Sequence, residues 1–203
     1  MMMPLLDDFP PDVTKHRRIV EEETSTAVVF AVAEATDTDA LELTPLYEVL
    51  DPDALDRFFN DEQRNSRSCK ARLIFPFEDC WVAVRSDDQI TVVPQEELDV
   101  LPSSSQRELY QAKHEWTTVP PLSTTLLQAL KQLPIQRDLL PRKPLTTIID
   151  LDSLDRLFAP IDKQSRRDAG WLSFSAYGYL ITIHSGGQIR FAPATRSPQE
   201  GAV

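Results

Sequence analysis

The chain has few of the residues from which catalytic and cofactor-binding sites are usually built. It contains five glycines, two cysteines and three histidines in 203 residues. Neither GxxxxGK[ST] nor GxGxxG occurs, so a nucleotide cradle is not expected. No cysteine or histidine spacing indicates a metal site, and no GxSxG elbow marks a nucleophilic serine. We therefore expect no enzyme activity, no cofactor and no bound metal.

Long apolar runs are also missing. No window approaches the roughly 18 apolar residues that a membrane-spanning helix needs. The opening stretch, MMMPLLDDFPPD, lacks the basic segment and the apolar run of a secretory signal peptide. Cys69 and Cys80 are expected to be free thiols because they do not lie opposite each other in the predicted hairpins. The simplest expectation is a cytoplasmic protein without membrane contact.

Lysine is scarce, although the chain is rich in charge. There are 6 Lys against 15 Arg and 19 Asp against 13 Glu, and the formal net charge is −11. This composition favours a salt-rich cytoplasm, where charge repulsion is screened within about 3 Å at 1 M salt. An ordinary acidic protein is the alternative. The negative charge argues against a broad nucleic-acid-binding surface, but it is compatible with a local basic patch.

What the chain does contain is an internal repeat. PLYEVLDPDALDRFF at 45–59 recurs as PLTTIIDLDSLDRLF at 144–158, an offset of 99 residues with eight identities. The offset then holds without a gap to Pro94. Two copies are too few for a solenoid, which needs at least three, so they indicate a duplicated domain. We expect a first domain at 14–95, a connector at 96–112 and a second domain at 113–194.

Each copy shows the same order of elements: an extended piece, an amphipathic helix with Ser or Thr as its N-cap, a second short helix, and three strands. Pairs of Gly, Asp or Glu between the strands predict two-residue hairpin turns, because these residues tolerate positive φ. The turns are placed at Glu78-Asp79, Asp87-Asp88, Tyr177-Gly178 and Gly186-Gly187. The extended pieces and first helices are placed at 16–21 and 25–36, and at 114–119 and 123–133.

An upstream match at an offset of 98 aligns KHRR with KHEW. It places His16 and His114 at corresponding positions of the extended pieces. We expect both to be edge-strand residues rather than metal ligands or pH-responsive contacts.

Both faces of the first copy's predicted sheet are apolar. A face that meets solvent should alternate apolar and polar residues, so the face away from the copy's own helices needs a cover. The predicted fold is α+β: two tandem copies of a small module (short strand, two helices, three-stranded antiparallel meander) packed as a pseudo-twofold pair, with the sheets stacked or joined. A homodimer contact is the alternative cover. One face is assigned Leu73, Phe75, Val82, Val84, Thr91 and Val93, and the other Ile74, Trp81, Ala83, Ile90 and Val92.

The repeated acids are interpreted as structural rather than catalytic. Asp51 and Asp150 stand at the N-cap positions of the second helices, where a carboxylate accepts a backbone N–H. Asp56 and Asp155, farther along the same helices, are expected to point outward. Paired catalytic carboxylates need a desolvated cleft that separates their pKa values, and the pattern supplies none.

The segments after the second helices are basic in both copies. Clustered bases on an acidic protein could contact phosphate groups or an acidic partner. The alternative is that they pair with neighbouring acids such as Asp61 and Asp162. The candidate contact residues are Arg64, Arg67, Lys163, Arg166 and Arg167, with Lys70 and Arg72 nearby.

The first copy resembles a known family, most specifically over residues 27–59. The resemblance lies in AVVFAVAEATDTDALEL, then PLYEVLDPDALDRFF, then a meander that ends in QITVVP. This pattern resembles the halobacterial output domain, type one. The second copy, 123–193, is similar through SFSAYGYLITIHSGGQIRF, but it lacks the acidic loop after its first helix and the Pro after the cap. The resemblance implies a haloarchaeal source and a small module found alone or attached to receiver and sensor domains.

These observations lead to an expected role without catalysis. We expect a signalling or regulatory output module that acts through protein–protein contacts, using exposed apolar sheet surface or the paired basic loops. A DNA-binding transcriptional regulator that uses those loops is the alternative, so nucleic acid is the less favoured partner. Reversing Arg67 and Arg166 to Glu should abolish DNA binding in that case.

Overall fold

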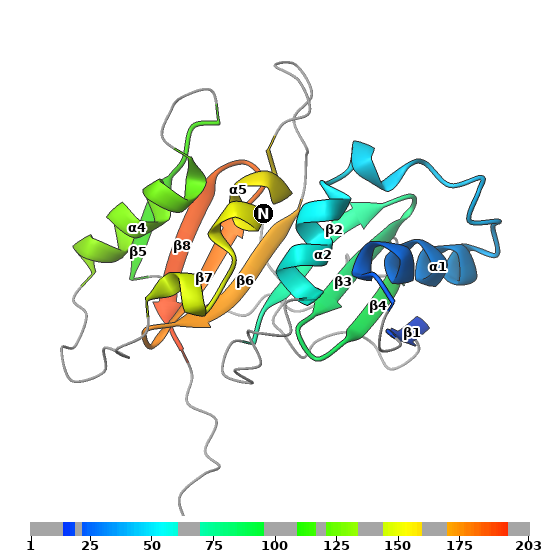
Figure 1. Ribbon diagram of the computed structural model, residues 1–203, viewed down its shortest axis with the longest axis horizontal. Coiled ribbons are helices and arrows are strands. Elements are labelled where there is room, and N and C mark those ends of the chain that lie inside the picture. The colour runs from blue at the N-terminus through cyan, green and yellow to red at the C-terminus, as the bar shows by residue number, and fades with distance from the viewer. Residues whose placement is uncertain are drawn as a thin grey trace, which may run out of the picture.

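A single antiparallel sheet of eight strands forms the centre of the molecule (Figure 1). The computed structural model describes residues 14–18, 22–60, 70–95, 109–116, 121–133, 144–159 and 170–194. The strands are β1 Thr14–Arg17, β2 Arg72–Phe77, β3 Cys80–Arg85, β4 Gln89–Pro94, β5 Tyr110–Lys113, β6 Trp171–Ala176, β7 Tyr179–His184 and β8 Gln188–Pro193. Their order is β1-β4-β3-β2-β6-β7-β8-β5, so each copy contributes one half of the sheet.

The helices of both copies lie on the same face of this sheet (Figure 1). The predicted first helices are confirmed to within one residue, because their apolar residues recur at helical spacing and pack on the strands. The described helices are α1 Thr24–Thr36, α2 Pro52–Asn60, α4 Leu122–Gln132 and α5 Leu151–Leu157, with 3-10 turns η1 Leu46–Glu48 and η4 Leu145–Thr147. The fold is therefore α+β with one helical layer and one sheet layer, as the repeat predicts.

The two copies join through β2 and β6 about a pseudo-twofold axis. Leu73 lies opposite Leu172, which is its own counterpart at the offset of 99. In the two flanking pairs, each residue of one pair is the repeat counterpart of a residue in the other pair. The register is therefore symmetric about the axis. We call this junction the seam. Its flanking pairs are Ile74 with Trp171 and Arg72 with Ser173.

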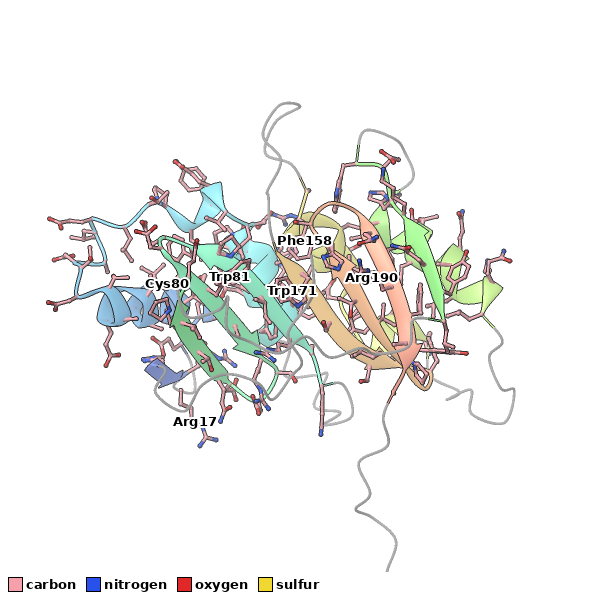
Figure 2. The ribbon with its side chains drawn as sticks, turned by 180° about the vertical axis from the view of Figure 1, so that it is seen from behind. Arg17, Cys80, Trp81, Phe158, Trp171 and Arg190 are labelled. Carbon is pink, nitrogen blue, oxygen red and sulfur yellow. The ribbon has the colours of Figure 1, made fainter. Side chains whose placement is uncertain are left out.

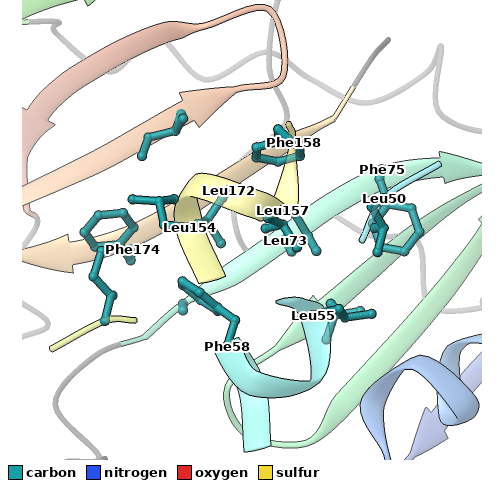
Figure 3. Close-up of a cluster of buried hydrophobic side chains, with 14 of the residues drawn as sticks. Leu50, Leu55, Phe58, Leu73, Phe75, Leu154, Leu157, Phe158, Leu172 and Phe174 are labelled. Atoms are coloured by element: carbon teal, nitrogen blue, oxygen red, sulfur yellow. The ribbon is translucent and has the colours of Figure 1, made fainter. Parts of the chain in front are cut away.

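The core lies between the sheet and the helices and continues across the seam (Figure 3). Leu73 and Leu172 are fully buried in it, and α2 and α5 contact each other above them. Burial of one leucine side chain stabilises a fold by about 1.5–3 kcal/mol. The two buried leucines therefore make the seam a stabilising apolar contact between the copies. Its helix residues include Leu55, Phe58, Leu154, Leu157 and Phe158.

The predicted two-residue turns are correct in the first hairpin of each copy and wrong in the second. Phe77 pairs with Cys80, as a two-residue turn requires, but Val84 pairs with Ile90 rather than with Thr91. The cause is a three-residue loop that closes with Asp88 at φ 63°. Gly187, at φ 83°, does the same in the second copy.

This shift of one residue moves every side chain of β4 to the opposite face. Ile90 and Val92 therefore lie in the core beside the helices. Thr91 and Val93 lie on the other face, paired with Ala83 and Trp81. The predicted face assignment is wrong for this strand and correct for β2 and β3.

The extended pieces also begin and end earlier than predicted. β1 ends at Arg17, opposite Gln89, the first residue of its partner strand; one more backbone hydrogen bond follows, from the Arg18 N–H to the Asp88 carbonyl oxygen at 3.0 Å. By this pairing the counterpart of His16 is Ala112, since Ile90 and Ile189 are repeat partners. His114 lies just past β5, where its ring is buried and its Nδ1 is 3.0 Å from Thr125 Oγ1. The proposed correspondence of the two histidines is wrong.

The second copy extends the first copy's sheet and does not stack upon it. The face opposite the helices therefore carries no helix within the described residues (Figure 2). We call it the helix-free face. The expectation that the second copy covers this face is wrong, because a seam symmetric about Leu73 and Leu172 joins the sheets edge to edge and places both sets of helices on one side.

Candidate binding surface

The two faces of the sheet differ in how well the repeat is kept. On the helix side of the three meander strands, every position that is apolar in one copy is apolar in the other, as with Phe75 and Phe174. On the helix-free face the second copy is more polar than the first. Polar residues replace apolar ones at Ile74 and Ser173, Pro76 and Ser175, and Ala83 and Thr182, whereas Arg72 and Trp171 show the reverse. The duplication has thus preserved a core and produced an asymmetric outer face.

The helix-free face bears no Asp or Glu among its described strand residues. The described strands carry no Asp or Glu on their helix side either, so the two faces differ in their bases, which lie on the helix-free face. Two of its bases are paired with acids of adjoining loops: Arg85 Nη2 lies 2.9 Å from Asp87, and Lys113 Nζ lies 2.7 Å from Glu115. Its bases with described side chains are Arg17, Arg72, Arg85, Lys113 and Arg190.

Two tryptophans meet on this face beside the seam (Figure 2). Trp81 comes from β3 and Trp171 from β6, and their ring centroids are 5.6 Å apart at an angle of 51°. Both are half-buried. His184 adjoins Trp171, with ring centroids 6.4 Å apart. Burial, assisted by the charge of Arg190, lowers the pKa of His184 to about 4, so the imidazole is neutral at pH 7.

The accessible part of the helix-free face lies at the seam, on the second copy and at the sheet edges. Ile74, Ala83 and Val93, in the middle of the first copy's half, are buried. By contrast, Ser173 and Arg190 are only half-buried, and Arg190 donates to Gln188 Oε1 at 2.9 Å. The surface that a partner can reach is therefore the polar half, bounded by the tryptophan pair.

The repeated acids bind backbone groups of the helices. Asp51 Oδ1 accepts the Ala54 N–H at 3.0 Å, and Asp150 Oδ1 accepts the Ser153 N–H at 2.9 Å, which is the geometry of a side-chain N-cap. Arg156 of the second copy also lies 2.8 Å from Asp51 of the first. These contacts occupy the carboxylates structurally and provide no catalytic cleft.

Asp56 and Asp155 do not point outward, as the sequence had suggested. Asp56 accepts both the N–H and the hydroxyl of Ser25, at 2.7 Å each. Asp155 does the same for Ser123, at 2.6 and 2.7 Å. The first helices begin after Glu23 and Pro121, which provide no side-chain cap, so the cap comes instead from the neighbouring helix. The predicted Ser or Thr N-caps are therefore wrong.

A second surface lies on the opposite side, at the acidic segment between α1 and η1. Leu41 is 94% exposed and Tyr47 is 56% exposed. The segment is held in place by hydrogen bonds: Leu41 N–H donates to Asp39 Oδ1 at 2.9 Å, and Thr44 N–H to Glu78 Oε1 at 2.6 Å. Phe30, on the outer side of α1, is 52% exposed. We call Phe30, Leu41 and Tyr47 the exposed apolar set.

The basic-loop residues named from the sequence, Arg64, Arg67, Lys163, Arg166 and Arg167, lie outside the described residues. Lys70 is exposed at the start of the described strand region, and Arg72 is buried on the helix-free face. Sequence reasoning missed the tryptophan pair. Alternation along β3 places Trp81 on this face, but only the pairing of β2 with β6, which the sequence left open, brings Trp171 beside it.

Other kinds of site find no support in the part of the chain that the structure describes. No group of His, Cys, Asp and Glu there could hold a metal ion. A shallow cleft lined by Arg18, Phe59 and Asp88 leaves no room for a small ligand, whose pockets usually measure roughly 300 Å³ or more. Among the described helices, none is long and apolar enough to cross a bilayer.

Comparison with known proteins identifies the repeat unit. The model of the family described as halobacterial output domain 1 matches residues 20–94 and again residues 120–193. No curated protein and no solved structure matches the chain. Each match covers the helices and the three-stranded meander of one copy, whereas the edge strands β1 and β5 lie outside the matches, which together cover more than half of the sequence. The chain therefore belongs to the halobacterial output domain 1 family and carries two tandem copies of the domain.

Proposed function

We propose that the chain is a non-enzymatic output module of haloarchaeal signalling that acts through protein–protein contacts. The observation that supports this most directly is the exposed apolar set, large side chains that remain in solvent on an ordered segment. Exposed large apolar side chains on a fixed scaffold are typical of protein interaction sites. Family membership supports the signalling role, since the family is one of output domains.

The surroundings of the exposed apolar set indicate the chemistry of its partner. Asp39 and Glu42 flank Leu41, and Glu48 follows Tyr47. A matching surface would offer apolar recesses bordered by Lys or Arg. In concentrated salt the apolar part would dominate affinity, because ion pairs are screened over a few ångströms.

The test is a pull-down under salt close to that of the native cytoplasm, with the full chain as bait and with co-purifying protein and nucleic acid both quantified. The double variant Leu41→Ser, Tyr47→Ser should lose a stoichiometric protein partner. Leu127→Ser is the matched control, because Leu127 is 38% exposed on the other copy's helix α4. Retention of the partner by the double variant, or its loss in the control alone, would contradict the proposal.

DNA binding through the basic loops stays a prediction, because those residues lie outside the described ones. Its test is the double reversal Arg67→Glu, Arg166→Glu. If DNA co-purifies with the wild-type chain and disappears with this variant while far-UV circular dichroism is unchanged, the loops carry the function.

A further inference from the structure

We propose that the helix-free face binds single-stranded nucleic acid along its accessible part, from the tryptophan pair at the seam to the edge at β5. This surface lies on the other side of the sheet from the exposed apolar set. The inference therefore goes beyond the proposed protein contact and does not depend on it.

The first argument is the charge of the face. The described strands carry no Asp or Glu on either face, but the Lys and Arg side chains that the structure describes in them all lie on the helix-free face. Arg190 and Lys113 occupy its second half and Arg85 its first. The ion pairs of Arg85 and Lys113 with loop acids are at the surface, where such pairs contribute little and exchange readily. A polyanion is the partner that this distribution fits.

The second argument is the aromatic pair. Single-stranded nucleic acids bind to proteins that combine a basic surface with aromatic rings on which bases stack. Trp81 and Trp171 are half-buried neighbours, and they are tilted rather than parallel, so each keeps part of its ring available. Ser173 and Gln188 add hydrogen-bonding groups that could reach base edges or phosphates.

The third argument is shape, which favours a single strand over a duplex. Eight strands at a spacing of about 4.8 Å make a sheet about 34 Å wide. The major groove of B-DNA is only about 12 Å wide, so the face cannot enter it. A single strand can lie flat on the sheet and turn its bases toward the tryptophans.

A second copy of this chain is a poorer occupant of the face. If two molecules stacked their helix-free faces against each other, Arg190 and Arg85 of each molecule would enter the interface. The described strands would supply no carboxylate to pair with them. Like charges at such an interface disfavour association. An acidic protein surface is the remaining competitor, and the experiment separates it from nucleic acid.

The experiment measures fluorescence anisotropy of a fluorescein-labelled twelve-residue thymidine oligonucleotide with the full chain. Potassium chloride is lowered in steps from 3 M to the lowest concentration at which circular dichroism still shows the native fold. We expect binding that strengthens as salt falls, and at least about tenfold weaker binding to a duplex of the same length. Arg190→Gln and Trp171→Leu should each weaken binding about fivefold or more, as loss of a phosphate or stacking contact does.

Arg57→Gln is the matched control, because Arg57 is exposed on α2, on the helix side. It should change affinity less than twofold. If Trp171→Leu fails to fold, Arg190→Gln carries the test alone. The proposal is overturned by any of four results: no binding by the folded chain at any salt, equal or tighter binding of the duplex, face variants that match the Arg57→Gln control, or poly-glutamate that competes as strongly as the oligonucleotide. The last result would assign the face to an acidic protein.

Discussion

Asp56 and Asp155 show how a single residue can join two helices. Each carboxylate lies on a second helix and accepts two hydrogen bonds from a serine in the first turn of the preceding helix. The backbone N–H groups at a helix start have no intrahelical partner, so the carboxylate satisfies one of them and favours the positive end of the helix dipole. The repeated DRF and DRL sequences are therefore constrained by a contact more than 30 residues away in the sequence.

Replacement of Asp56 or Asp155 by Ala should destabilise the fold by about 1–3 kcal/mol, because a partly buried backbone donor and a hydroxyl lose their acceptor. Ser25→Ala and Ser123→Ala should cost about half as much, since the backbone bond remains. Chemical denaturation in concentrated salt measures this. Glu42→Ala, at an exposed loop position, is the control and should be nearly neutral. Equal effects of Asp56→Ala and Glu42→Ala would contradict the capping role.

His184 predicts a pH dependence of stability. Its folded pKa of about 4 lies below the ordinary value of 6.5, so the unfolded chain binds a proton more readily than the folded chain. The contribution of His184 to stability is therefore fully present above pH 6.5 and is lost as the pH falls toward 4, by roughly 1–2 kcal/mol for this partly solvent-screened ring. Denaturant titrations at pH 7 and pH 4.5 test this. His184→Gln should reduce the loss of unfolding free energy between pH 7 and pH 4.5. An equal loss in this variant and in the wild-type chain would show that His184 does not contribute.

At the scale of elements, the sequence predicted what depends on local pattern. The helices follow from apolar residues at helical spacing, and the first hairpins follow from their two-residue turns. The second hairpins were misassigned because Asp87-Asp88 and Gly186-Gly187 fit two-residue and three-residue loops equally well by composition. Only the backbone shows that the third loop residue, Asp88 or Gly187, carries the positive φ.

Gly187→Ala tests this loop. Gly187 has φ 83°, and a Cβ there would lie 2.1 Å from the carbonyl oxygen of His114. The substitution should cost more than about 2 kcal/mol, because a strained φ adds to a clash with backbone. Gly186→Ala is the adjacent control: nothing lies within 4 Å of its added Cβ, so we expect a change of less than about 1 kcal/mol. Thermal unfolding compares the two, and equal effects would contradict the loop geometry.

At the scale of the molecule, the duplication predicted a pseudo-twofold pair but left open whether the sheets stack or join. Nothing local distinguishes these arrangements, because a strand with apolar residues on both faces fits either. The helix-free face was hidden for the same reason: its residues come from all eight strands and gather only in the folded sheet.

The seam should make the two copies unfold as one unit. Leu73→Ala and Leu172→Ala each remove a fully buried side chain at equivalent places, so each should cost about 2–5 kcal/mol. Because α2 and α5 share this core, calorimetry should show one transition that moves to lower temperature in both variants. Two separate transitions, of which only one shifts in each variant, would indicate independent domains.

The most direct test of the account is hydrogen–deuterium exchange of the backbone amides at the seam. A continuous sheet predicts that amides of 72–74 and 171–173 are protected as strongly as those between β2 and β3, because both sides of each strand are paired. If the copies instead meet in another way, β2 and β6 become sheet edges. Alternate amides in these segments would then exchange at the rate of exposed edge strands, and that result would contradict the joined sheet and the helix-free face built upon it.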